Sequence, residues 1–70
     1  MAGDVAHRSI RTLSLSERVV QLLESGGAHT VGDLVMLGKA GCLAIRGFGQ
    51  RSLQEVRAEL ANLGLHLIGD

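Results

Sequence analysis

The chain has 70 residues, so it forms one domain at most, and a hydrophobic core of that size is marginal unless its side chains pack efficiently. Hydrophobic residues make up 46% of the chain and aromatic residues only 1%, so Leu, Val, Ile and Ala must form the core, which favours helices. The formal net charge is zero, which argues against nonspecific coating of nucleic acid, so any DNA contact must come from a local basic cluster.

Cysteine content and hydropathy indicate the cellular compartment in which we expect the protein. Cys42 is the only cysteine, so no internal disulfide forms, and a reducing cytosolic compartment is the simplest interpretation. No apolar run approaches the roughly 18 residues that span a bilayer, and the first residues do not resemble a secretory signal. We therefore expect a soluble, cytoplasmic protein without a membrane partner.

The N-terminal quarter of the sequence carries weak structural signals. Residues 1–9 have mixed polarity and no period, which predicts a flexible tail before a helical domain over residues 10–70. The stretch "SIRTLSLS" then alternates Ile10, Leu13 and Leu15 with polar residues. We expect it to run extended across the domain without joining a sheet.

Capping signals place the first two helices after this stretch. The Ser16 hydroxyl can cap a helix, Glu17 suits the positive end of its dipole, and Gly26 with Gly27 ends it. The buried face of this helix is expected to carry Val19, Leu22 and Leu23. Thr30 and Asp33 form a variant of the capping box for a short second helix that buries Val31, Leu34 and Val35.

Glycines divide the rest of the sequence. Gly38 and Gly41 mark a third, very short helical piece near residues 39–43, where Cys42 is expected to act as a small buried hydrophobe. After the turn at residues 47–49, a last helix places apolar side chains on one stripe, namely Leu53, Val56, Leu60 and Leu63. Its other side is expected to be solvated and to carry Gln54, Glu55, Arg57, Glu59 and Asn62.

The residues after the last helix complete the expected fold. Gly64 is placed to end the helix, and Leu65 and Leu67 are expected to fold back over the core. The sum is an all-α domain, a compact bundle of four to five short helices.

The stretch "AIRGFGQRSLQEV", residues 44–56, carries the clearest chemical signal. Gly47 and Gly49 allow a tight turn and a close approach to another molecule. The helix that follows begins with amides that lack intrahelical partners, so a phosphate can bind there, assisted by Arg51 and Ser52. A plain corner between two packed helices also explains the glycines, although the Gln50-Arg51-Ser52 sequence favours the phosphate site.

Two residues of this hairpin have competing interpretations. Phe48 either stacks on a base or, as we favour, inserts as a hydrophobic plug beneath the turn. Arg46, at the leading edge, either contacts a phosphate or is merely exposed.

Other chemistry finds little support in the sequence. His7, His29, His66 and Cys42 lack close metal-ligand spacing, so we expect no metal site and no cofactor. A nucleophile elbow is absent, and there is little room for a substrate cavity, so we expect no catalytic residues and no small-molecule substrate.

Four segments at matching separations lead to a family resemblance. They are "LSLSERVVQLL", "TVGDLV", "AIRGFGQRSLQEV" and "LANLGLHL". Through them the protein resembles, without a gap from about Ile10 to Leu67, the C-terminal domain of the bacterial RNA polymerase alpha subunit. The resemblance implies a helix-hairpin-helix domain that binds the minor groove of A·T-rich DNA upstream of promoters. It also implies association with the nucleoid and surfaces for RNA polymerase, transcription activators and the sigma factor.

The resemblance also implies roles for individual residues. Arg18 matches the arginine that enters the minor groove, and Gln21 stands where asparagine is usual. The positions that contact or order the DNA backbone are matched by Gly49, Arg51, Ser52 and Glu55, with arginine in place of the usual lysine at 51. With the hairpin residues, the candidate DNA-binding set is Arg18, Gln21, Arg46, Gly47, Gly49, Gln50, Arg51, Ser52 and Glu55. A narrow A·T minor groove attracts an inserted arginine electrostatically, which agrees with this assignment.

The sequence departs from the family pattern at several positions. Gly47 replaces a common asparagine and Gln50 a common basic residue. Arg11, Thr12 and Ser14 stand where acidic residues usually serve the sigma-factor contact. These departures, and the start at Met1, suggest a free-standing relative or a divergent copy of the domain, while an excised piece of an alpha subunit is the alternative.

Two other functions compete with DNA binding in transcription. A protein-interaction domain of the same fold that has lost DNA affinity is favoured by the zero net charge and the altered contact positions. A helix-hairpin-helix accessory domain of a repair or recombination enzyme would bind duplexes regardless of A·T content.

Overall fold

The computed structural model describes residues 2–70, with side chains from Asp4 onward, and consists of helices joined by short turns. The elements are α1 (Ala2–His7), the 3₁₀ helix η1 (Ile10–Thr12), α2 (Glu17–Ser25), α3 (Val31–Ala44) and α4 (Gln50–Asn62). This part of the protein has no strand, and its extended pairing is a single bridge between Ser9 and Thr30. The predicted all-α class is confirmed.

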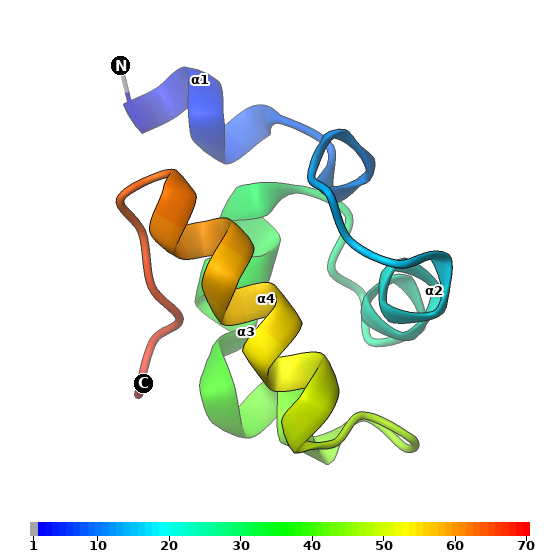
Figure 1. The fold of residues 1–70 in the computed structure, drawn as a ribbon. Helices are drawn as coiled ribbons and strands as arrows, with labels where there is room; N and C mark the ends of the chain where they lie inside the picture. The colour runs from blue at the N-terminus through cyan, green and yellow to red at the C-terminus, as the bar shows by residue number, and fades with distance from the viewer. Residues whose placement is uncertain (1) are drawn as a thin grey trace.

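The helices pack around one apolar core. Figure 1 shows α4 crossing α3 at the centre, with α1 over one end of α3 and α2 to one side. The core contains buried side chains from η1, α2, α3 and α4 and from turns, and the partly buried Val5 of α1 packs against it. Its buried members are Ile10, Leu13, Val19, Val20, Leu23, Ala28, Val31, Leu34, Cys42, Phe48, Leu53, Val56, Leu60 and Leu67.

The N-terminal residues differ from the flexible tail that the sequence predicts. Met1 lies outside the described residues, but α1 is a helix of 6 residues that packs against α3. A Cβ built on Gly32 would stand 3.0 Å from the carbonyl oxygen of Ala6, so this glycine allows the two helices to approach closely. A helix this short is not stable alone, so contacts distant in sequence determine it.

The first long helix, α2, begins and ends where the sequence predicts. The Ser16 hydroxyl accepts a hydrogen bond from the Val19 amide at 3.3 Å, and Gly26 caps the other end. The segment before α2 was expected to be extended throughout. It instead contains η1 and a bend at Leu13 and Ser14, and the backbone dihedral angles are extended at Leu13 and Ser16.

Helix α3 has a capped start and a kink. The Thr30 hydroxyl accepts a bond from the Asp33 amide, and the Asp33 carboxylate accepts one from the Thr30 amide, which is the predicted capping box. At Gly38 the backbone has φ 76° and ψ 175°, so the helix changes direction there. The predicted division at Gly38 is confirmed, and the short piece expected near residues 39–43 is the second part of α3.

The capping carboxylate makes the stability of the fold sensitive to acid. Amides of His29 and Thr30 donate to the Asp33 carboxylate and hold its pKa below the ordinary value of 3.8. The resulting stabilisation is complete above the unfolded pKa and is lost as pH falls through the lower folded pKa. Thermal melts followed by circular dichroism between pH 5 and about pH 2 should therefore show a smaller loss of stability for Asp33→Asn than for the unmodified protein. Equal losses would contradict this role.

The outer face of α4 is less solvated than the sequence predicts. Arg57 was expected to be free in solvent, but its Nε donates to the Asp70 carboxylate at 2.6 Å, and a second bond joins the same groups. Glu59 accepts a bond from the Ser14 amide, and Glu55 accepts one from the Ser16 amide. These partners are distant in sequence, so the helical period alone does not reveal them.

Candidate nucleic-acid interface

The hairpin between α3 and α4 is built on a buried aromatic ring. Phe48 is only 6% exposed, and its amide donates to the Ile45 carbonyl at 3.0 Å, so the favoured plug beneath the turn is confirmed. Gly47 has a φ of 89°, a backbone conformation that side chains with a Cβ rarely adopt. The turn therefore needs glycine at this position.

The start of α4 is unlike the starts of α2 and α3. Those two helices are capped by Ser16 and Thr30, whereas Gly49 begins α4 without a side-chain cap. The first bond of the helix runs from the Leu53 amide to the Gly49 carbonyl at 3.0 Å, which leaves the amides before Leu53 without helical acceptors. Nothing lies within 4 Å of a Cβ built on Gly49. The helix start is open to an anionic ligand.

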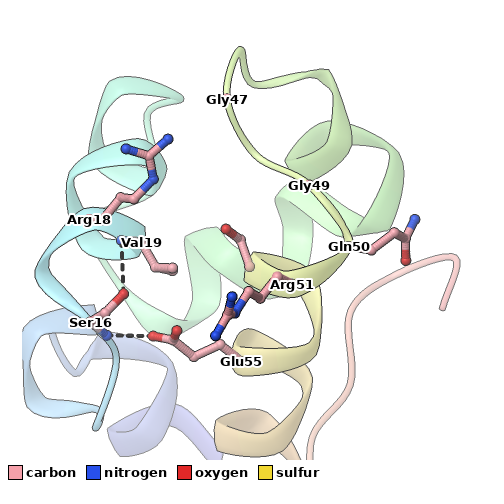
Figure 2. A pocket seen from close by; sticks show the side chains of 9 residues that line it. Ser16, Arg18, Val19, Gly47, Gly49, Gln50, Arg51 and Glu55 are labelled. Atoms are coloured by element: carbon pink, nitrogen blue, oxygen red, sulfur yellow. Dashed lines mark hydrogen bonds between the residues drawn. The ribbon is translucent and has the colours of Figure 1, made fainter.

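An open groove of about 530 Å³ joins this helix start to α2. Figure 2 shows the guanidinium group of Arg18 directed towards Gly47 from α2, with Arg51 and Glu55 facing α2 from α4. The groove contains most of the predicted DNA-binding set. Its lining residues are Ser16, Arg18, Val19, Gly47, Gly49, Gln50, Arg51, Ser52 and Glu55.

Two predicted site residues lie outside the groove lining. Gln21 is exposed on α2, and its side-chain amide donates to the Glu17 carboxylate at 3.3 Å. Arg46 is exposed on the hairpin directly after Ile45, which caps α3. Gln50 lines the groove, but Figure 2 shows its side chain pointing away from α2. The structure thus brings Arg18 and Arg51 to one groove, which Gln21 and Arg46 do not line.

The arginines near the groove have no carboxylate partner within the part of the protein that the structure describes. No ion pair is formed by Arg18, Arg46 or Arg51, whereas Arg11 and Arg57 are both paired. A guanidinium group without an internal partner keeps its donors available for phosphate. The protein therefore has a local basic region at Arg18 and Arg51 although its net charge is zero.

Most acidic side chains are engaged in bonds within the molecule. The carboxylates that accept hydrogen bonds are those of Glu17, Glu24, Asp33, Glu55, Glu59 and Asp70. Arg11 binds both oxygens of Glu24, at 2.9 and 2.8 Å, and this hydrogen-bonded pair holds the pKa of Glu24 below its ordinary value. The acidic groups therefore neutralise cations away from the groove or bind backbone amides.

Ser16 and Val19 line the groove although the sequence was interpreted otherwise for both. Ser16 was predicted only as a helix cap and Val19 only as a core residue. Their positions indicate this role, because Ser16 and Val19 lie within one turn of Arg18 at the start of α2. Not every neighbour of Arg18 borders the groove, however, because Glu17 does not line it.

A metal cluster and a membrane-spanning helix are both absent from the described residues. Among the described residues, no three His, Cys, Asp or Glu side chains are grouped so that they could hold a metal ion. None of the helices there has the length and apolar character needed to cross a membrane.

The fold and this groove define an all-α domain with a helix-hairpin-helix. Comparison with protein families gives a match over residues 2–62 to the C-terminal domain of the alpha subunit of bacterial RNA polymerase. The chain belongs to this family, which supports a role associated with transcription.

Individual relatives agree with the family match. The chain is 45% identical over 67 residues to DNA-directed RNA polymerase subunit alpha of Kineococcus radiotolerans, and the match covers 96% of this chain and 20% of that protein. It is 45% identical to the subunit of Acidothermus cellulolyticus and 40% identical to that of Frankia alni, again with 96% of this chain and 19% of each relative covered. The chain spans about a fifth of the length of these relatives.

Proposed function

We propose that this protein is a non-catalytic DNA-binding module that recognises the minor groove of A·T-rich DNA upstream of promoters, in the cytoplasm and close to the nucleoid. Arg18 enters the minor groove, where the narrow A·T geometry concentrates negative potential. The amides after Gly49, with Arg51 and the Ser52 hydroxyl, hold the phosphates of the backbone.

The observation that carries this proposal is the shared groove. It brings an arginine from α2 and an arginine from α4 beside an uncapped helix start, and neither guanidinium group has an ion pair among the described residues. Each feature attracts an anion, so together they suit a ligand with several negative charges, and the phosphates of a DNA strand are such a ligand.

The same domain is proposed to offer surfaces to RNA polymerase and transcription activators. A sigma factor is the less favoured partner, because Arg11 occupies a position where the family resemblance implies an acidic residue. Its guanidinium group is also already bound to Glu24. This surface thus differs in charge from the one that the resemblance implies.

The proposal is tested by fluorescence anisotropy titrations with an A-tract duplex and a G·C duplex of equal length at low salt. We expect tighter binding to the A-tract, and weak binding overall because the domain is small and neutral. Contact with two or three phosphates predicts a slope of log affinity against log salt of about −2 to −3. Weak binding of this kind becomes effective when tethering raises the local concentration.

Two outcomes would contradict the proposal and identify its rivals. Equal affinity for the two duplexes would indicate the backbone contact of a repair-type helix-hairpin-helix. No binding to either duplex by the folded protein would indicate a protein-interaction domain.

A further inference from the structure

Two carboxylates of α4 bind the segment that leads into α2. Glu55 accepts a hydrogen bond from the Ser16 amide, and Glu59 accepts one from the Ser14 amide at 2.9 Å. These bonds join residues 39 and 45 positions apart, so they tie together two elements that the backbone itself connects only through α3.

The two acceptors lie one helical turn apart on α4, and the two donors lie two residues apart in the segment before α2. The chain bends at Ser14, and the backbone is extended at Ser16, directly before α2. Carboxylates four residues apart on a helix share one face and rise about 6 Å along its axis. The two bonds therefore hold this segment at two points, one helical turn apart on α4.

These two bonds connect α4 to the segment before α2, and α2 and α4 are the two helices that carry the candidate interface. Ser16 is the cap of α2 and precedes Arg18 by two residues, while α4 carries Arg51 at its start. Glu59 is absent from the groove lining, so its carboxylate has no place in a DNA contact there. Its effect on the groove is exerted through the position of the segment that it holds.

We propose that Glu59 is a positioning residue for DNA binding, which fixes the start of α2 against α4 so that Arg18 and Arg51 reach one duplex together. This inference depends on the proposed function. A positioning role and a simple charge effect have opposite signs, because removing a carboxylate near DNA strengthens binding if charge alone matters. A variant that keeps the charge but shortens the side chain therefore separates them, because charge alone predicts no change for it.

Two conservative variants separate the effect of side-chain length on DNA binding from the effect of charge. Glu59→Gln keeps an acceptor at the same reach without the charge, and Glu59→Asp keeps the charge with a shorter side chain. We expect Glu59→Gln to bind the A-tract duplex as tightly as the unmodified protein or slightly more tightly. We expect Glu59→Asp to bind about three- to tenfold more weakly, with faster hydrogen exchange at the Ser14 amide. Circular dichroism melts confirm that both variants are folded.

A double-mutant cycle with Arg18→Ala tests whether Glu59 acts through that arginine. Once Arg18 is absent, Glu59→Asp is expected to weaken binding less than it does in the unmodified protein. An equal loss in both backgrounds, or undiminished binding by Glu59→Asp alone, would overturn the inference and leave the proposed function standing. No DNA binding by the unmodified protein would instead overturn the proposed function itself.

Discussion

Arg18→Ala is expected to abolish the preference for A·T-rich duplex and to lower the affinity for it by about tenfold or more. The Arg18 side chain is exposed and forms no ion pair in the part of the protein that the structure describes, so its removal costs the fold little. Its guanidinium group lies beside the hairpin, where a Cβ on Gly47 would be 3.8 Å from it. Anisotropy titrations with A-tract and G·C duplexes measure both effects.

Two further arginine variants make this result specific. Arg51→Ala removes a proposed phosphate contact, so it is expected to weaken binding to both duplexes alike and to reduce the salt slope by about 1. Arg8→Ala removes the same charge from a residue that does not line the groove. A control variant that lost A-tract preference as Arg18→Ala does would show that net charge, and not the groove, determines recognition.

The largest expected effect on stability comes from Gly38→Ala. At φ 76° and ψ 175° the backbone occupies a region that is essentially restricted to glycine, and a Cβ there would lie 2.8 Å from the Ile68 carbonyl oxygen. Strain and overlap together predict a loss of about 2–4 kcal/mol in the free energy of unfolding. Urea unfolding followed by circular dichroism measures this loss.

Gly64→Ala is a control for that variant at another glycine with a positive φ. Gly64 has a φ of 74°, but a Cβ built there meets nothing within 4 Å, so the substitution introduces strain without overlap. We expect it to destabilise by about 1 kcal/mol, less than Gly38→Ala. Equal losses for the two variants would show that contact with Ile68 contributes nothing to the requirement for glycine at Gly38.

Helix boundaries were predictable because their causes are local. A hydroxyl at Ser16 and the Thr30 pairing with Asp33 lie within one turn of the helices that they cap, and the two helical parts divide at Gly38, as the sequence indicates. The kink fits a position that needs an unusual backbone conformation. Such signals require no knowledge of the rest of the fold.

Features that depend on distant contacts were not predictable in the same way. Helix α1 depends on the close approach at Gly32, and the orientation of Glu59 depends on an amide 45 residues earlier. The candidate site was likewise predictable only in part. Resemblance placed Arg18 and the hairpin in one set, and they meet in the groove, but the bond that turns Gln21 towards Glu17 involves side-chain geometry that spacing does not contain.

Arg18 and Arg51 line the groove and form no ion pair among the described residues, although the protein has no net charge, so its charges are unevenly distributed. Far from a duplex, beyond the screening length of about 8 Å at physiological salt, such a molecule feels almost no attraction. In the proposed binding mode, the field close to the duplex turns the domain so that the groove faces the DNA. Added salt should therefore shorten the lifetime of the proposed complex much more than it slows the encounter.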